Sequence, residues 1–288
     1  MTPNAKGALF MMGSMASFTL NDVVVKLLAE DLPLFQIVFL RGVLTTILLT
    51  ATVAALGRLS FRIPRRDRGK VALRTLFEIA ALVTFLTALI NMQIANATAI
   101  LSALPLAVTL GAALIFREQV GWRRMSAICV GAVGVLLIVQ PGAEGFNIYS
   151  LLALVTVVLV AGRDLVTRSF SNDLPSMTVA VITAAAICVF GGVMSVTEVW
   201  VRPSGAQLGL LALASFFIIG GYVFSILVMR VGEVAVTAPF RYTSLVFALI
   251  MGWLVFAEFP NALALVGAVI VVATGVFTLI RERRVKHA

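Results

Sequence analysis

Residues 21–33 read NDVVVKLLAEDLP, and residues 163–175 read RDLVTRSFSNDLP. In each stretch an acid is followed four residues later by a base, and then by a second acid with a Leu-Pro pair. The two stretches lie 142 positions apart, and a second match, between residues 116–118 (FRE) and 256–258 (FAE), has an offset of 140. Two matches in one order and at nearly one offset indicate an internal repeat.

The composition around this repeat excludes a soluble protein. Of the 288 residues, 61% are hydrophobic and 12% are charged, and the mean hydropathy is +1.08. A soluble domain has about 25% charged residues. These values exclude a soluble enzyme, a secreted disulfide scaffold and a disordered regulator. They favour long apolar helices in a lipid bilayer.

Apolar windows bounded by charge, proline or polar clusters predict an all-α integral membrane protein. Each window is close to the roughly 20 residues that a helix needs to cross the hydrocarbon core. The apolar runs are continuous, unlike the alternating strands of a membrane barrel. The ten predicted spans are 7–28, 35–57, 70–90, 95–115, 122–139, 148–168, 176–196, 206–229, 235–256 and 260–280.

The positions of the basic residues predict the orientation of these spans. The net charge is +9, but the 22 lysines and arginines cluster in short gaps between apolar runs. With the N-terminus inside, 18 of them face the inside, two (Lys26 and Arg202) face the outside and two (Arg41 and Arg241) lie within spans. This split predicts a multi-pass protein of the bacterial inner membrane with both termini in the cytoplasm. The same clustering argues against nucleic-acid binding.

Each repeat contains five predicted spans, so the second repeat enters the membrane from the opposite face. We expect a first five-helix repeat over residues 1–140 and a second over residues 141–288. Two inverted repeats are the architecture of secondary transporters, in which the halves exchange roles to expose a central site to either side.

Several of these stretches also carry a family resemblance. They are Phe39-Leu40-Arg41, the segment from residues 116–118 to Gly134-Val135, and its counterpart from Glu258 to Gly275-Val276. The chain resembles the EamA-type transporters of the drug/metabolite transporter superfamily over its whole length, twice. The resemblance implies ten helices and a central cavity lined by helices 1, 3 and 4 of each half. Within the superfamily, the chain resembles most the amino-acid exporters of the YddG type. Residues 238–242 are similar to those of branches that import riboflavin or S-adenosylmethionine.

Four residues are candidate substrate-binding residues. Arg41 lies about six residues into its span, where its guanidinium either binds a carboxylate as a fork or ties helices together and reaches the headgroups. Glu78 lies eight residues into its span and is either a proton-coupling group, a contact to a substrate ammonium, or a packing residue. Arg241 and Tyr242 lie early in the ninth span, where they either contact the substrate or anchor the helix at the lipid headgroups or in the cytoplasm.

Other residues are candidates for gating or for shaping helix ends. Pro105 and Pro239 interrupt helical hydrogen bonding and are candidate hinges. Asn91 and Asn96 bracket a turn and are candidate gating contacts or ordinary loop residues. The repeated acids are expected to be structural, since each recurs at an equivalent position. Asp22 and Asp164 would end the first helix of each half, and Glu118 and Glu258 would anchor helix ends.

The functional expectation is a secondary active transporter of small metabolites, most simply amino acids moving outward. Uptake of riboflavin or S-adenosylmethionine is the alternative, and a membrane-embedded enzyme is the alternative from another class. No catalytic or metal-binding pattern supports an enzyme, because His287 is the single histidine and the two cysteines lie in apolar runs. The expected partners are a small-molecule substrate, the bilayer and, as one option, coupling protons, with no cofactor.

Overall fold

The computed structural model describes residues 2–55, 63–117, 121–141, 147–171, 173–231 and 234–286. Over these ranges the secondary structure is helical, and ten helical segments are long and apolar enough to cross a membrane. They begin and end within a few residues of the predicted spans. Eight of the ten are single helices: α1 (Pro3–Leu28), α2 (Leu34–Ala55), α3 (Arg68–Asn91), α6 (Trp122–Val139), α7 (Tyr149–Arg168), α8 (Ser176–Ser195), α9 (Gly205–Val231) and α12 (Ala262–Lys286). A short 3-10 turn, η1 (Arg65–Asp67), precedes α3.

The fourth and ninth spans are broken inside the membrane. The fourth consists of α4 (Ile94–Leu101) and α5 (Leu104–Phe116), and the ninth of α10 (Val234–Thr237), η2 (Ala238–Tyr242) and α11 (Thr243–Phe256). A proline stands in the first turn of the new segment in each case, Pro105 in α5 and Pro239 in η2. Proline has no amide hydrogen to continue a helix, so the interruption follows from the sequence.

Both broken spans also end in the same unusual way. Arg117 after α5 has a φ of 54° and Ala257 after α11 has a φ of 52°. Left-handed backbone is uncommon for residues other than glycine, and it satisfies the last helical carbonyls. The two residues lie 140 positions apart, at the second repeated stretch.

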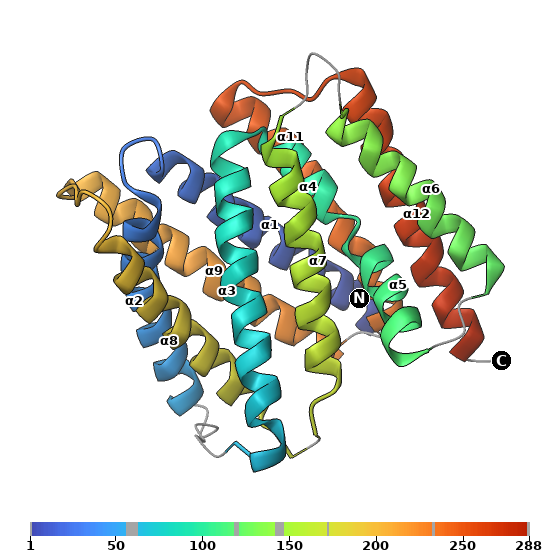
Figure 1. The fold of residues 1–288 in the computed structure, drawn as a ribbon, viewed down its shortest axis with the longest axis horizontal. Coiled ribbons are helices and arrows are strands. Elements are labelled where there is room, and N and C mark those ends of the chain that lie inside the picture. The colour runs from blue at the N-terminus through green and yellow to red at the C-terminus, as the bar shows by residue number, and fades with distance from the viewer. Residues whose placement is uncertain are drawn as a thin grey trace.

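The helices pack mainly against partners from the other half of the chain (Figure 1). The largest contacts join α1 to α9 and α3 to α7, which lie side by side in Figure 1. Helix α2 packs on α8, α6 on α12 and α4 on α11. Each of the first two contacts pairs a first helix with a third helix of the other half, and each of the last three pairs equivalent helices. In the described part of the chain, the largest helix contacts therefore join the two halves to each other.

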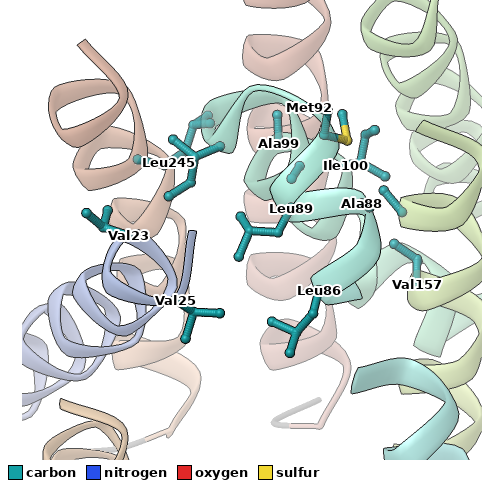
Figure 2. Close-up of a cluster of buried hydrophobic side chains, with 14 of the residues drawn as sticks. Val23, Val25, Leu86, Ala88, Leu89, Met92, Ala99, Ile100, Val157 and Leu245 are labelled. Atoms are coloured by element: carbon teal, nitrogen blue, oxygen red, sulfur yellow. The ribbon is translucent and has the colours of Figure 1, made fainter. Parts of the chain in front are cut away.

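The main apolar cluster lies where α1, α3, α4, α7 and α11 meet (Figure 2). Leu89, Ile94 and Ile100 are fully buried there, at the junction of α3 and α4. The periphery is equally apolar but exposed: Leu114 is 73% exposed, Val158 69% and Phe216 67%. Lipid tails would cover such side chains, in agreement with a membrane protein.

Glycines allow α6 and α12 to approach at the level of the backbone. A Cβ atom placed on Gly134 would lie 2.9 Å from the carbonyl oxygen of Gly267, and one placed on Gly267 would meet the carbonyl oxygen of Gly134. Close contact between small residues is a major source of helix association in membranes, where water exclusion does not contribute.

Candidate substrate cavity

A cavity of about 360 Å³ lies among the helices of both halves. Its apolar wall includes Phe18 of α1, Phe85 of α3 and Leu279 of α12. Its volume falls in the range of small-molecule sites, about 300 to 1,000 Å³. The polar side chains in its lining are Thr19, Asp22, Thr98, Ser102, Thr109, Asp164, Arg241, Tyr242 and Ser244. Within the described ranges α9 contributes no lining residue, so the third helix lines the cavity in the first half only.

Both helix breaks border this cavity. Ser102 and Pro105 come from the break between α4 and α5, and Ala238 and Tyr242 come from η2. In hydrocarbon, irregular backbone is tolerated only where it is buried in protein or lines a cavity. The breaks thus place polar groups at the depth where a substrate would bind.

Asp22 lies between the middle and the C-terminal end of α1. Two hydrogen bonds connect its carboxylate through Asn21 to Arg41. Asn21 Nδ2 donates a hydrogen bond to Asp22 Oδ1 at 3.0 Å, and Arg41 Nη1 of α2 donates to Asn21 Oδ1 at 2.8 Å. Arg41 is 6% exposed and lies outside the cavity lining. Its guanidinium supports the carboxylate of Asp22 through Asn21, while Asp22 itself faces the cavity.

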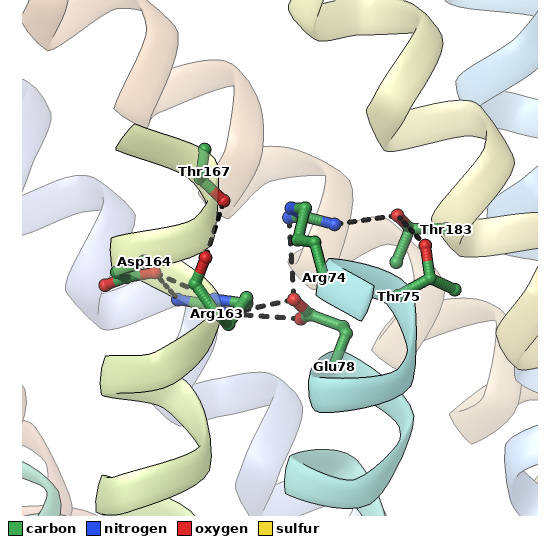
Figure 3. Close-up of polar contacts among 7 residues, drawn as sticks. All are labelled: Arg74, Thr75, Glu78, Arg163, Asp164, Thr167 and Thr183. Atoms are coloured by element: carbon green, nitrogen blue, oxygen red, sulfur yellow. Dashed lines mark hydrogen bonds and ion pairs between the residues drawn. The ribbon is translucent and has the colours of Figure 1, made fainter. Parts of the chain in front are cut away.

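Asp164 of α7 is supported directly by its neighbour (Figure 3). Arg163 donates from Nε and Nη2 to Asp164 Oδ1, at 2.8 and 2.7 Å. Arg163 Nη1 also donates to both oxygens of Glu78 in α3, at 3.2 and 3.1 Å. Arg74 lies 3.5 Å from Glu78 and donates to Thr183 Oγ1 of α8 at 2.7 Å. The four charged groups form one chain that leads from the cavity wall to α8.

These contacts change the interpretation of the repeated acids. Helix α1 continues beyond Asp22 to Leu28, and α7 continues beyond Asp164 to Arg168. The expectation that the two acids end their helices is therefore wrong. Both line the cavity instead, because the inverted arrangement of the halves brings the two equivalent positions to one site. Glu78 lies outside the lining and pairs with arginines.

Arg241 and Tyr242, in contrast, lie in the cavity lining as the sequence suggested. Within the described residues, no carboxylate lies within salt-bridge distance of Arg241. Tyr242 is 8% exposed, and its hydroxyl is buried without a hydrogen-bond partner in the described part of the chain. That hydroxyl packs against Gly275 of α12, where a Cβ atom would clash with it.

An ion pair joins three elements at one end of the bundle, close to the cavity. Lys26 lies one turn beyond Asp22 on α1, and its Nζ is 2.8 Å from Glu258 Oε1. The same amine donates to the carbonyl oxygen of Met92 at 2.7 Å, and Glu258 Oε2 accepts from the amide of Ile94 at 3.3 Å. The pair therefore joins α1, the α3–α4 turn and the end of α11.

The residues equivalent to Lys26 and Phe256 lie at the other end of the bundle. Lys26 stacks over the ring of Phe256 at 4.8 Å, and Arg168 stacks over the ring of Phe116 at 5.6 Å. The residue pairs are related by the offsets 142 and 140 of the repeated stretches. Glu118, the counterpart of Glu258, lies outside the described residues.

The asparagines predicted as gating contacts lie near the Lys26 end and outside the cavity lining. Asn91 Nδ2 donates to the carbonyl oxygen of Thr87 at 2.8 Å, and Asn147 Nδ2 donates to the carbonyl oxygen of Asn91 at 2.9 Å. Asn96 Nδ2 donates to Gln93 Oε1 at 3.3 Å. Both asparagines thus take part in local turn contacts, and a gating role for them stays a prediction.

Relatives of known name resemble the chain over nearly its full length. The S-adenosylmethionine uptake transporter of Rickettsia bellii is 27% identical over 94% of this chain and 92% of its own. The riboflavin transporter of Rhizobium johnstonii is 26% identical over 96% and 92% of the two chains. The pseudopaline exporter of Pseudomonas aeruginosa is 26% identical over 91% and 92%.

A solved crystal structure shares the fold, with a TM-score of 0.69 over 98% of this chain and 99% of its own, at 16% identity. The EamA-like transporter family matches twice, over residues 5–140 and again over residues 147–280. These two matches cover most of the chain and adjoin at its middle. The ten spans and the central cavity agree with them. The chain is a membrane transporter and belongs to the EamA-like transporter family.

Proposed function

We propose that the chain is a secondary transporter of a small metabolite that carries a carboxylate together with positive charge, and that S-adenosylmethionine is the substrate that fits best. The observation that carries this proposal is the presence of Asp22, Asp164 and Arg241 in the lining of one cavity. Two anionic groups and one cationic group are complementary to a ligand with two cations and one anion.

S-adenosylmethionine has this charge pattern, because it carries an ammonium, a sulfonium and a carboxylate. Arg241 is suited to the carboxylate, which a guanidinium binds as a fork. Asp22 and Asp164 are suited to the two cations, and the rings of Phe18 and Phe85 offer apolar surface to the adenine. Several relatives from Rickettsia are named as uptake transporters of this compound.

Two other substrates are weaker candidates on the same grounds. A neutral amino acid supplies one cation and would leave one of the two acids without a ligand partner. The ring system of riboflavin carries no positive charge for either acid. Export of amino acids is nevertheless kept as the alternative, because a zwitterion still matches Arg241 and one carboxylate.

Transport would occur by alternating access between the two repeats, residues 1–140 and 141–288. Support comes from the pairing of equivalent helices across the halves and from the two family matches, which adjoin near residue 140. The Lys26–Glu258 pair would close one end and must break when the cavity opens there. The bias of lysines and arginines favours a cytoplasmic location for both termini in a bacterial inner membrane.

Calorimetric titration of the purified protein would test the substrate. We expect S-adenosylmethionine to bind more tightly than S-adenosylhomocysteine, which lacks the sulfonium charge but is otherwise almost the same molecule. Methionine and riboflavin are titrated in the same way, so that their affinities can be compared with that of S-adenosylmethionine. Asp22→Asn and Asp164→Asn should each weaken binding of S-adenosylmethionine about tenfold or more, since a hydrogen bond to a charged group contributes about 1.5 to 3 kcal/mol. Equal affinity for both adenosyl compounds, or tight binding of riboflavin alone, would refute the proposal.

A further inference from the structure

The two cavity acids occupy equivalent positions, but the residues that support them do not match. The offset of 142 relates Asp22 to Asp164, Asn21 to Arg163 and Arg41 to Thr183. The same offset relates the start of α2 at Leu34 to the start of α8 at Ser176. The positions are therefore equivalent in structure as well as in sequence.

In the first half, two residues support the acid. The cation is on the second helix, at Arg41, and reaches Asp22 through the amide of Asn21. In the second half, Arg163 alone supplies both the cation and the hydrogen bonds to the acid. Arg163 stands in the position of the bridging amide and donates to Asp164 with its own guanidinium, while Thr183 stands in the position of Arg41. The positive charge has thus exchanged places between the first and the second helix.

The surroundings of each arginine agree with this exchange. The Nη1 group of Arg163 is not used by Asp164, and it donates to both carboxylate oxygens of Glu78. Thr183, which carries no charge, accepts a hydrogen bond from Arg74, and Arg74 also pairs with Glu78. Three arginines and three acids form the two clusters together, so the charges of the supporting groups and the cavity acids sum to zero. Buried charge in a membrane protein is tolerated when it is paired in this way.

We propose that the Asn21–Arg41 pair and Arg163 are interchangeable positioning devices, each of which orients one cavity carboxylate toward a cationic group of the substrate. This inference rests on the proposed function, because it takes Asp22 and Asp164 to be the substrate contacts. In the described structure the supporting bonds go to Oδ1 of each acid. Among the described residues no hydrogen bond reaches either Oδ2 atom, and we assign these two atoms to the ligand. The position that supplies the guanidinium does not matter, provided that Oδ1 is held.

Moving the charge within one half tests the inference. Arg41→Thr removes the cation of the first half and should weaken binding of S-adenosylmethionine about tenfold or more, because the carboxylate loses its support. The double variant Asn21→Arg with Arg41→Thr rebuilds the arrangement of the second half. It should bind within about threefold of the original protein, a residual difference of less than one hydrogen bond. In the other half, Arg163→Asn should weaken binding, and Arg163→Asn with Thr183→Arg should restore it.

Two further measurements distinguish positioning from folding. The ratio of the affinities for S-adenosylmethionine and S-adenosylhomocysteine should fall in the single variants and return in the double variants. The melting temperature and size-exclusion profile of each variant show whether it is folded. If Arg41→Thr does not fold, Arg41→Lys takes its place. Arg41→Lys should bind S-adenosylmethionine more weakly than the double variant with the relocated arginine, because lysine has no fork.

The outcomes separate this inference from the proposed function. If Asp22→Asn and Asp164→Asn leave the affinity unchanged, the proposed function fails, and this inference with it. If they weaken binding but the folded double variants bind no better than the single ones, the acids are substrate contacts and the exchange of supporting charges is refuted.

Discussion

Lys26 and Glu258 lie 232 residues apart in the chain, yet the Lys26 amine donates to both carboxylate oxygens of Glu258, at 2.8 and 3.0 Å. The side chains are 9% and 26% exposed. The pair stands one helical turn from Asp22 and connects the first helix to the ninth span. A single turn of α1 therefore separates this ion pair from a cavity acid.

Neutralising this pair should open the end that it closes. In Lys26→Met, Glu258 keeps its bond to the Ile94 amide but loses its cation, and breaking a buried pair costs about 3 to 5 kcal/mol at most. We expect a cysteine placed at Ser102, in a background without Cys129 and Cys188, to react faster with a membrane-impermeant thiol reagent added on the Lys26 side. Asp31→Asn is the matched control, because it alters an exposed contact with Gln207 at the same end. Unchanged labelling in Lys26→Met would show that the pair does not hold the end closed.

Arg241 should recognise the carboxylate of the substrate. Arg241→Ala should raise KM in proteoliposomes more than Arg241→Lys does, because lysine keeps the charge but loses the fork. The expected loss is about tenfold or more for alanine. The methyl ester of the substrate, which has no carboxylate charge, should be transported equally by the original protein and by both variants. If the original protein and Arg241→Ala transport the unesterified substrate at equal rates, at matched expression, Arg241 does not contact the substrate.

The hydroxyl of Tyr242 has opposite consequences for stability and for binding. It is buried and has no partner among the described residues, and an unsatisfied buried hydroxyl costs about 1 to 3 kcal/mol. Tyr242→Phe should therefore raise the melting temperature of the empty protein. If the hydroxyl meets the substrate, the same variant weakens binding. A melting temperature that falls in Tyr242→Phe would mean that the hydroxyl is already satisfied.

The glycine contact between α6 and α12 should be sensitive to a single methyl group. Gly134→Ala and Gly267→Ala place a Cβ atom against backbone carbonyl oxygens, which cannot move aside as a side chain does. Overpacking of this kind typically costs about 1 to 3 kcal/mol. Gly209→Ala on α9 is the control, since no atom outside its own stretch of helix lies within 4 Å of its added Cβ. Thermal unfolding in detergent should show lower stability for the first two variants only.

Both termini should lie in the cytoplasm. The described ranges contain ten candidate spans, an even number, so we expect the termini to share a side. The sequence-based count assigns 18 of the 22 lysines and arginines to that side, which favours the cytoplasm. A reporter that is active only in the cytoplasm should function when fused after residue 286. The same reporter inserted after residue 203 should be inactive. The reverse pattern would invert the topology.

The sequence predicted the spans well and the site only in part. Hydropathy fixes where helices cross, because an apolar run of about 20 residues has few alternatives in a bilayer. Pro105 and Pro239 likewise revealed the broken helices, since proline acts locally. The environment of a charged side chain depends instead on which helices become neighbours. For Arg41 and Glu78 the sequence therefore left a substrate contact and a helix-packing role open, and in the structure both contact other side chains.

Asp22 and Asp164 show the same limit from the other direction, since their cavity position was not predicted. Their recurrence in the repeats was visible, but it suggested a structural role at helix ends. Whether two equivalent residues meet depends on where the symmetry axis passes, and a linear pattern does not contain that information. A signal was nevertheless present: an acid inside an apolar run, repeated in a chain with inverted halves, is brought toward the centre twice.

The pairing of α2 with α8, α4 with α11 and α6 with α12 has a thermodynamic consequence for the resting protein. If the two halves had identical sequences, the conformations open to either side would be related by a two-fold rotation about an axis in the membrane plane, and they would be equally populated. Each pair of equivalent helices contributes the same free energy to both, so those contacts cancel. The balance between the two conformations is then determined by the positions where the halves differ, such as Lys26 against Arg168 or Arg41 against Thr183. A few such positions, worth about 1.4 kcal/mol for each tenfold change in population, decide which side of the membrane the empty carrier faces.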